Sequence, residues 1–417
     1  MDGDVRGERE AFSSSTQRVA GTFKTGLSHG NRISHDPVDN ILFSLRSPMS
    51  PSPASPIRAA RVERLETVVI GAGQAGLAVG YHLAAQDADF VILDGAARVG
   101  DSWRHRWDSL RLFTPAVYSG LPGMHFPAPA LHLPDKDEVA DYLERYAERF
   151  DLPVRMGSAV QSLERVGDQY LITTSDRVFE AENVVVATGP FQRSKIPPLA
   201  ARLSTGIHQL HSSQYRSPFD LPDGPALVVG AGNSGAQIAL ELARYRTVWL
   251  AGRETGRIPR RLLGRDIYEW IWPVLTRLTL DTRLGRKLRT RTQRGDPLVG
   301  IPERMLRENG VKRVGRVTEE RDGLPVADGA ALEPKVIVWS TGFSPDYSWI
   351  QLPVLDDDGR PRHTRGIADD QPGLFFVGLR FQHRMTSALI GGVGADAEFI
   401  AAQVARRVAL AEASIAL

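Results

Sequence analysis

The sequence predicts an α/β fold in which one local unit occurs twice. Each copy has an apolar strand, a glycine-rich turn, a helix and a second strand, and the copies begin at Glu66–Ile70 and Ala226–Val229. Short apolar runs that alternate with helical stretches are typical of parallel sheets covered by helices. The length of 417 residues allows roughly two to three domains.

Composition restricts the chemistry. Hydrophobic residues make up 42% and charged residues 24%, as in an ordinary globular protein, and the net charge of +2 gives no reason to expect a nucleic-acid partner. The chain has no cysteine, which excludes disulphides, thiolate metal sites and a Cys-x-x-Cys redox pair. Redox chemistry would therefore require a bound cofactor. We expect no metal, no transmembrane segment and a cytoplasmic location.

Residues 1–60 differ from the rest of the chain. They are rich in Ser, Pro, Gly and Arg, show no sustained period and lack the apolar core of a signal peptide. We expect a disordered N-terminal extension, because such a segment buries too little apolar surface to offset its chain entropy. A targeting or regulatory arm and a true start at Met49 are the alternatives.

The first unit has the spacing of a phosphate-binding turn. Gly71–Gly76 follow the apolar strand and precede a helix from Leu77 to about Ala85 and a strand, Phe90–Asp94. The three glycines permit a tight turn, a close approach of the backbone to a pyrophosphate and close helix–strand packing. The helix N-terminus presents free amides to the phosphates. Asp94 stands where a carboxylate binds the ribose hydroxyls of a dinucleotide.

The second unit repeats this order with Gly230–Gly235, a helix to about Ala243 and a strand, Thr247–Leu250. With 39 glycines in 417 residues, chance gives roughly 0.3 matches to Gly-x-Gly-x-x-Gly, so two matches in this context favour dinucleotide sites over ordinary tight turns. No acid ends the second strand here. Arg253 can instead pair with a 2′-phosphate, which favours NADPH over NADH, although the adjacent Glu254 would oppose it.

Further motifs accompany the two units. The strands Asn183–Val186 and Val336–Trp339 run into similar turns, and residues 394–410 form an amphipathic helix. Gly100, Ser102 and Trp103 suit a loop that closes over a pyrophosphate and a ring. The alternative is a structural tryptophan pair in the core.

The order of these motifs resembles the class B flavin-containing monooxygenases, and within them the YUCCA-type and related bacterial enzymes, over residues 66–405. Besides the two glycine turns, the matching stretches are Gly100–Trp103, Leu131–Pro134, Tyr142–Ala147, Ala187–Gly189, His211–Tyr215, Ser340–Phe343, Gly378–Leu379 and Ser387–Leu389. The resemblance implies FAD at the first turn and NADPH at the second. It implies two nested Rossmann-like domains, with an FAD domain at 61–222 and 331–417 and an inserted NADPH domain at 223–330.

The glycine turns and the resemblance together predict the cofactor-binding residues. They are Gly71, Gly73, Gln74, Ala75, Gly76, Asp94, Gly100, Ser102, Trp103, Ala187, Thr188, Gly189, Gly230, Gly232, Asn233, Ser234, Gly235, Arg253, Thr341, Gly342, Gly378, Ser387 and Ala388.

The resemblance also implies a mechanism. NADPH would reduce the flavin, the reduced flavin would react with O₂ to a C4a-(hydro)peroxide, and a small organic substrate would be oxygenated. We predict no catalytic side chain, since the flavin does the chemistry. The helix that begins near Gly391–Gly394 is expected to point its N-terminus at the flavin ring. The sequence does not decide the oligomeric state, and a homodimer is one possibility.

The chain departs from the family pattern at three positions. Gly206 lies five residues before His211 rather than four, Phe113 stands where many members carry an active-site Asn, and Tyr215 stands where Baeyer–Villiger enzymes carry Trp. The first two keep open an NAD(P)H reductase or oxidase that releases H₂O₂, and His211 could merely brace a linker. A non-catalytic flavin-binding redox sensor is the third reading.

Two remaining features have ordinary alternatives. The aromatic stretch Glu269–Leu275 could cap a substrate pocket, touch a membrane or belong to the core. Basic runs such as Arg283–Arg291 usually form a solvated helix face.

Overall fold

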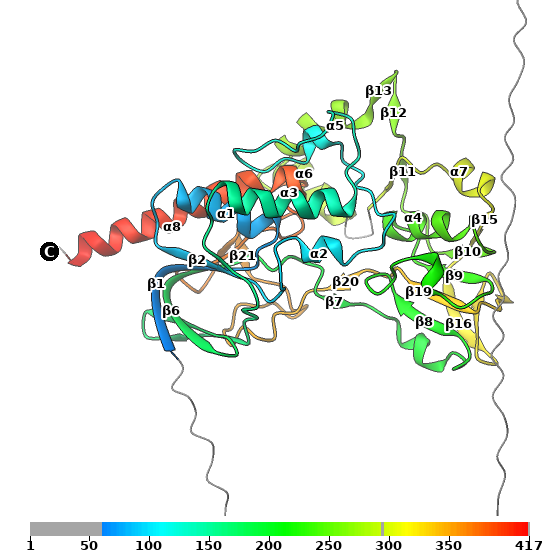
Figure 1. Cartoon of the computed structure of the whole chain (residues 1–417), viewed down its shortest axis with the longest axis horizontal. Helices are drawn as coiled ribbons and strands as arrows, with labels where there is room; N and C mark the ends of the chain where they lie inside the picture. Colours follow the sequence, from blue (N-terminus) through cyan, green and yellow to red (C-terminus); the bar gives the residue numbers. More distant parts are fainter. Residues whose placement is uncertain (1–60, 293–295, 416–417) are drawn as a thin grey trace, which may run out of the picture. The chain divides into compact units, whose positions relative to one another are not determined.

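The computed structural model describes residues 61–292 and 296–415, which contain two separate main sheets (Figure 1). The predicted extension at residues 1–60 lies outside the described residues. No helix in the described ranges is long and apolar enough to cross a membrane.

The first sheet has nine strands and a parallel centre, β23-β6-β1-β2-β3. Ile70 of β1 lies between Leu93 of β2 and Val186 of β6, so these strands end at one edge of the sheet. An antiparallel hairpin, β4–β5, extends β6 on its other end. The strands are β1 (Arg61–Ile70), β2 (Phe90–Leu93), β3 (Val154–Arg155), β4 (Ser162–Val166), β5 (Gln169–Thr173), β6 (Arg177–Val186), β21 (His363–Thr364), β22 (Ile367–Ala368) and β23 (Leu374–Phe376).

The second sheet has five parallel strands in the order β15-β10-β9-β19-β8. They are β8 (His208–His211), β9 (Ala226–Val229), β10 (Val248–Ala251), β15 (Val311–Val314) and β19 (Val336–Trp339). The three strands β9, β10 and β19, which the sequence predicts, are apolar runs, whereas β8 is mostly polar. The sheet therefore draws on residues beyond the predicted 223–330 on both sides.

Helices cover both sheets. Figure 1 shows α1 (Gln74–Ala84), α3 (Lys136–Arg149) and α8 (Gly394–Ile415) over one face of the first sheet, where their apolar residues form one core cluster with Val69, Ile92 and Val185. The opposite face packs on residues 347–354. The second sheet carries α4 (Asn233–Leu242) on β9 and β10, and α7 (Glu303–Glu308) on β15.

Short elements complete the described chain. They are α2 (Asp101–Arg104), α5 (Ile267–Arg277), α6 (Arg283–Thr292), the antiparallel pairs β12 (Arg261–Leu262) with β13 (Arg265–Asp266) and β7 (Arg193–Ser194) with β20 (Phe343–Ser344), the parallel pair β11 (Arg257–Ile258) with β14 (Leu298–Val299), and the small sheet β16 (Val317–Arg321), β17 (Leu324–Ala327) and β18 (Ala330–Ala331).

Candidate dinucleotide sites

The first glycine turn connects β1 to α1 in a conformation that needs its glycines. Gly71 has φ +109°, and a Cβ on it would stand 2.7 Å from the Ala187 carbonyl oxygen. A Cβ on Gly76 would stand 1.8 Å from the Gly71 carbonyl oxygen. Gly73 differs, because a Cβ there would meet no atom within 4 Å. Two glycines therefore allow close packing, and the middle one faces open space in which a ligand could approach the backbone.

The helices that follow the two glycine turns begin without a side-chain cap. The N-caps of α1 and α4 are Gly73 and Gly232, and neither first turn contains an acid. By contrast, α3 and α5 each begin with a complete capping box, formed by Asp135 with Glu138 and by Asp266 with Glu269. The amides at the start of α1 and α4 are thus left for an external acceptor, and a phosphate suits both their hydrogen bonding and the helix dipole.

Asp94 is held beside the first turn. Its two carboxylate oxygens accept hydrogen bonds from the Ala72 amide at 2.7 Å and the Ala96 amide at 2.8 Å. These bonds fix the carboxylate at the end of β2, next to the glycine turn, as the sequence predicts. The position suits a ribose, whose hydroxyls can donate to the remaining lone pairs.

Three distant segments meet at the first turn. The Ala187 amide donates to the Ile70 carbonyl oxygen at 2.8 Å, and Ala187 also lies against Gly71. Gly378, which follows β23 and has φ +83°, is so close to α1 that a Cβ on it would stand 2.8 Å from the Ala75 Cβ. The structure thus brings Gly71–Gly76, Ala187 and Gly378 to one edge of the first sheet.

The second turn repeats the first in detail. Gly230 has φ +113°, and a Cβ on it would stand 2.1 Å from the Ser340 carbonyl oxygen, as Gly71 does from Ala187. Gly235 approaches the Gly230 carbonyl oxygen as closely as Gly76 approaches Gly71, and Gly232 again faces open space. Thr341 and Gly342 therefore directly follow a residue, Ser340, that contacts the second turn.

Side chains around the second turn divide into two groups. Asn233 is engaged by the protein, since its Nδ2 donates to the Pro297 carbonyl oxygen at 3.1 Å and its Oδ1 accepts from the Val299 amide at 3.0 Å. Ser234 and Arg253 are exposed. Glu254, expected to oppose Arg253, accepts a hydrogen bond from Arg257 at 3.2 Å.

The Gly100–Trp103 stretch lies against α3. Gly100 has φ +86°, and its Cα approaches α3 so closely that a Cβ would stand 2.6 Å from the Ala140 carbonyl oxygen. Ser102 is exposed. Trp103 is half-buried and packs against core residues of both main sheets, while Trp107 is buried in the core of the second. The expectation of a structural tryptophan in the core therefore holds for Trp107. Trp103 instead contacts the cores of both main sheets.

His211 joins β8 to the turn after β19. Its Nδ1 accepts from the Ser213 amide at 3.1 Å, and its Nε2 lies 3.0 Å from the Gly342 carbonyl oxygen. An amide can only donate and a carbonyl can only accept, so the ring is neutral with its proton on Nε2. Burial lowers the pKa of His211, and the charge of Arg106 adds to this. His211 is therefore a positioning residue at this junction.

Acidification should reveal the neutral state of His211. Because its pKa is lower in the folded than in the unfolded chain, stability is fully present above the unfolded pKa of about 6.5 and falls as pH decreases below it, by up to about 1.4 kcal/mol per pH unit. We expect His211→Gln, whose amide can still donate to Gly342, to show a shallower loss in denaturant unfolding between about pH 5 and 7. Identical slopes for both proteins would contradict this account.

Two linkers connect the sheets, one containing β7 after Gly189 and one containing β20 after Gly342, and they lie side by side. β7 pairs with β20, and Thr341 donates its hydroxyl hydrogen to the Lys195 carbonyl oxygen. The Gln192 side-chain Nε2 donates to the Thr188 hydroxyl at 2.6 Å and to the Gly189 carbonyl oxygen at 2.9 Å. Thr188, Gly189, Thr341 and Gly342 therefore fix the crossings between the sheets.

Ser387 and Ala388 lie in the loop that precedes α8. The buried Ser387 hydroxyl oxygen accepts from the amides of His383 at 3.2 Å and Arg384 at 3.0 Å. The predicted helix starts at Gly394, but its first turn carries the fully buried Asp396. Burial raises the pKa of Asp396, which lies at the start of α8.

The residues at which the chain departs from the family pattern have structural partners. The Phe113 carbonyl oxygen accepts from Arg260 at 2.8 Å, and the buried Tyr215 donates to Glu241 at 2.8 Å. The aromatic stretch Glu269–Leu275 is partly packed and partly exposed: the ring centroids of Trp272 and Tyr118 lie 5.1 Å apart, whereas Trp270 is exposed.

Sequence reasoning missed Arg106, whose guanidinium lies 5.4 Å over the Phe343 ring at the linker junction. Its only signal is its place three residues after Trp103.

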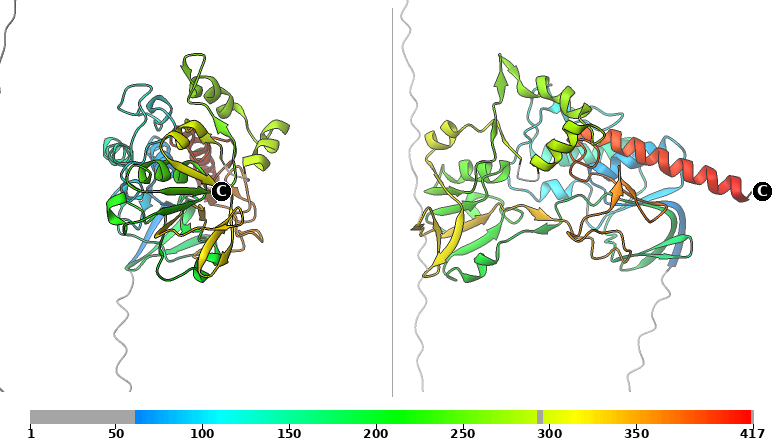
Figure 2. Two further views of the ribbon diagram at one scale, coloured as in Figure 1. Left: turned by 90° about the vertical axis from the view of Figure 1, so that its right-hand side faces the viewer. Right: turned by 180° about the vertical axis from the view of Figure 1, so that it is seen from behind.

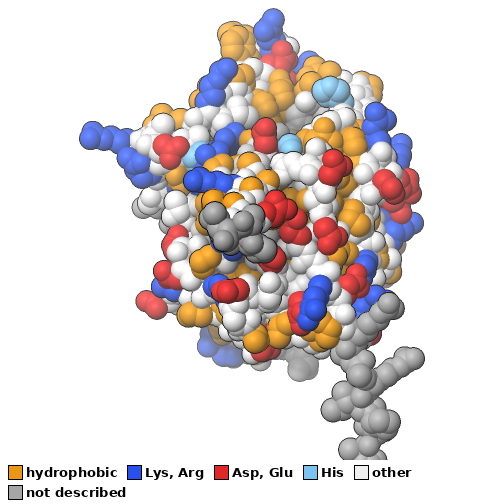
Figure 3. All heavy atoms as spheres, turned by 90° about the vertical axis from the view of Figure 1, so that its left-hand side faces the viewer, with side chains coloured by type: hydrophobic (Ala, Val, Ile, Leu, Met, Phe, Trp, Pro, Cys, Tyr) orange, Lys and Arg blue, Asp and Glu red, His pale blue; other side chains and the backbone are white. Residues whose placement is uncertain are grey.

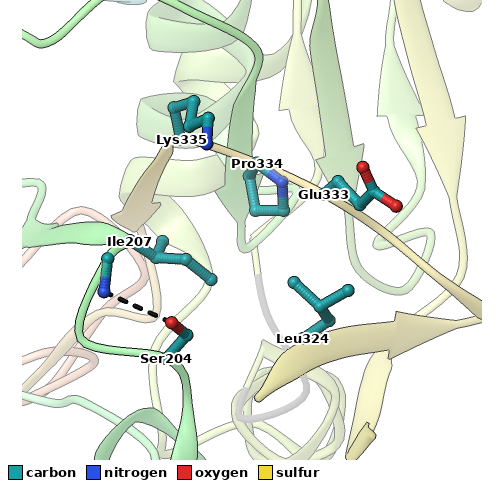
Figure 4. Close-up of a pocket in the computed structure, with 7 residues that line it drawn as sticks. Ser204, Ile207, Leu324, Glu333, Pro334 and Lys335 are labelled. Atoms are coloured by element: carbon teal, nitrogen blue, oxygen red, sulfur yellow. Dashed lines mark hydrogen bonds between the residues drawn. The ribbon is translucent and has the colours of Figure 1, made fainter. Parts of the chain in front are cut away.

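A pocket of about 230 Å³ lies elsewhere, against the second sheet (Figure 4). No residue of either glycine turn lines it, and we assign it no part in the chemistry. Among the described residues no group of three or more His, Cys, Asp or Glu could hold a metal ion. The lining residues are Ser204, Gly206, Ile207, Leu324, Glu333, Pro334 and Lys335.

Comparisons with known proteins agree with this geometry. Residues 68–378 match the family described as pyridine nucleotide-disulphide oxidoreductase. An uncharacterized CzcO-like oxidoreductase of Geobacillus kaustophilus is 44% identical over 81% of this chain and 97% of its own. The indole-3-pyruvate monooxygenase YUCCA4 of Oryza sativa subsp. japonica is 27% identical over 89% and 94%.

A solved structure extends the agreement to the fold. The flavin-containing monooxygenase from Stenotrophomonas maltophilia is 29% identical, with a TM-score of 0.69 over 83% of this chain and 99% of that chain. Since this chain has no cysteine, the disulphide chemistry in the family's description does not apply to it. The chain belongs to the pyridine nucleotide-disulphide oxidoreductase family and, within it, to the flavin monooxygenase superfamily of FAD- and NADPH-dependent oxidoreductases.

Proposed function

We propose that this enzyme is a monooxygenase that uses NADPH and O₂ to oxygenate a small organic substrate. The observation that carries the proposal is the pair of uncapped helix N-termini, each next to a glycine that faces open space. Two such turns suit two dinucleotides. When bound, FAD supplies the chemistry, because its ring takes hydride from NADPH and in its reduced form reacts with O₂.

FAD is assigned to the first turn. The amides that begin α1 bind its pyrophosphate, Asp94 binds its ribose, and Trp103 helps to enclose it. The other residues of this site are Gly71, Gly73, Gln74, Ala75, Gly76, Gly100, Ser102, Ala187, Thr188, Gly189, Gly378, Ser387 and Ala388.

NADPH is assigned to the second turn. The amides that begin α4 bind its pyrophosphate, with Gly230, Gly232, Gly235 and the backbone of Asn233 shaping the turn. Ser234 and Arg253 are exposed beside it and supply polar contacts. Thr341 borders the same turn, and Gly342 follows it in the chain.

The domains are nested in this proposal. An FAD domain contains the first sheet, and an NADPH domain contains the second, inserted between β7 and β20. This moves the boundaries outward from 223–330, because β8 and β19 both belong to the second sheet. The two linkers pair with each other as β7 and β20, which suits one insertion with adjacent ends.

Arg253 should decide the choice of nicotinamide cofactor. We expect Arg253→Ala to weaken NADPH use by about 10- to 100-fold, because a charge-assisted contact to the 2′-phosphate is lost. Flavin reduction by NADH, which lacks that phosphate, should change little. The rates of anaerobic flavin reduction by both cofactors measure the difference. Equal losses with NADPH and NADH would assign Arg253 another role.

Reoxidation kinetics test the oxygenase function against a reductase that releases H₂O₂. The relatives named as monooxygenases support oxygenation, whereas Phe113 supports the reductase. After anaerobic reduction with NADPH, O₂ is added and the return of oxidised flavin absorbance is followed together with H₂O₂. A delayed return, with H₂O₂ suppressed by sulphide, amine or ketone substrates, supports the monooxygenase. Immediate return with one H₂O₂ per flavin, unchanged by every substrate, supports the reductase.

A further inference from the structure

The chain concentrates its positive charge in one segment, Arg257–Thr292, here called the basic flap. It comprises β11, the β12–β13 hairpin, α5 and α6. Three acids in it, Asp266, Glu269 and Asp281, give a net charge of +7, so that the remaining chain, at +2 minus +7, carries −5. The ten basic residues are Arg257, Arg260, Arg261, Arg265, Arg277, Arg283, Arg286, Lys287, Arg289 and Arg291.

The flap's basic residues differ in how close they lie to acidic residues. Arg257 pairs with Glu303, and Arg260 pairs with Asp266 at 2.6 Å. By contrast, α6 contains basic residues and no acid. Its side chains Arg283, Arg286, Lys287 and Arg289 are all exposed. On the face shown in Figure 3, basic and acidic side chains are mixed. Within the flap, α6 therefore carries charge of one sign only.

Large apolar side chains are exposed among these cations. Leu262 and Leu263 lie at the turn of the β12–β13 hairpin, where Leu263 is 85% exposed. Leu284 on α6 is 61% exposed and Trp270 on α5 is 45% exposed. Figures 1 and 2 show the hairpin projecting from the second sheet's side of the molecule, with α5 and α6 near its base. Leu263 is therefore left mostly to solvent at the end of a projecting hairpin, as is about half of Leu262.

The other side of the flap is anchored. Ile267 and Tyr268 are buried, Trp272 packs on Tyr118, and the Leu280 amide donates to the His383 carbonyl oxygen at 2.9 Å. The flap thus presents one fixed face to the protein. Its outer face combines apolar side chains with cations.

We propose that the basic flap docks the enzyme on an anionic lipid surface. Leu262, Leu263 and Trp270 enter the headgroup region, and the cations of α6 contact lipid phosphates. Tryptophan favours this depth of a bilayer. A nucleic acid would bind the cations but gives no reason for the exposed leucines. The binding is peripheral, and it is independent of the monooxygenase function.

Vesicle sedimentation tests the proposal with the FAD-loaded full chain. We expect the protein to sediment with vesicles of phosphatidylcholine and phosphatidylglycerol but not with phosphatidylcholine alone, and added salt should weaken the binding. Leu262→Ser with Leu263→Ser should lower the affinity about tenfold or more, and so should Arg283→Glu with Lys287→Glu.

Matched variants keep this test specific. Arg202→Glu with Arg316→Glu makes the same change of net charge on exposed residues outside the flap, and Val166→Ser with Phe219→Ser removes exposed apolar side chains elsewhere. Both should bind vesicles like the wild type, and flavin content should be equal in all proteins. The proposal is overturned by absence of wild-type binding or by equal losses in flap and control variants. It is also overturned if the leucine variant binds normally while duplex DNA competes with the vesicles.

Discussion

Gly73→Asp is expected to give a folded protein that does not hold FAD. Gly73 has φ −78° and ψ −174°, which aspartate adopts freely, and a Cβ there meets no atom within 4 Å. Aspartate is also a preferred N-cap, so the helix itself should not suffer. Its carboxylate would accept the α1 amides and place a negative charge where the pyrophosphate belongs. We expect FAD affinity to fall about 100-fold or more.

Flavin absorbance per protein and titration of the apoprotein with FAD measure this loss. The circular dichroism spectrum and the unfolding midpoint of the flavin-free variant should match those of flavin-free wild type, because the new cap is compatible with α1. A Gly73→Asp protein that keeps one FAD and is reduced by NADPH at the normal rate would show that α1 does not bind the pyrophosphate.

Gly232→Asp is the matching change at the second turn, with the opposite expected loss. Gly232 has φ −80° and ψ −175° and the same open space, so the protein should fold and keep FAD. Its flavin should be reduced by NADPH about 100-fold more slowly at limiting cofactor, because the α4 amides are blocked. Anaerobic stopped-flow reduction measures the rate, and dithionite should still reduce the flavin fully.

The two variants control each other. Gly73→Asp should lose flavin, and Gly232→Asp should lose only NADPH. The reverse result, with flavin lost from Gly232→Asp and kept by Gly73→Asp, would exchange the two assignments. Loss of flavin in both would mean that the turns act through stability rather than through separate sites.

The central strands of the fold could be predicted because they are buried on both faces. β2, β9 and β19 are short continuous apolar runs next to turn residues, and the sequence places them within a residue of their observed bounds. β8 could not be predicted. Its sequence, His208–His211, is polar, and it becomes a strand only because β19 offers an edge. Because β8 was not predicted, the expected domain boundary at 222 lies after this strand of the second sheet.

The candidate sites divide in the same way. Gly71, Gly76, Gly230 and Gly235 are visible in the sequence because their spacing is local. Contacts between distant segments, such as Gly378 with Ala75 or His211 with Gly342, have no local signal. Asn233 shows the limit of motif reasoning, because its side chain is committed to residues 297–299.

The most direct test of the central claim is the fate of the oxygen atoms. The enzyme is reduced anaerobically with one equivalent of NADPH, mixed with ¹⁸O₂ and a panel of sulphides, amines and ketones, and the products are analysed by mass spectrometry alongside H₂O₂. We predict one ¹⁸O atom in a product for each NADPH consumed, with the second atom in water. Complete recovery of the label as H₂O₂ with every substrate would contradict the monooxygenase and leave an NADPH-dependent reductase.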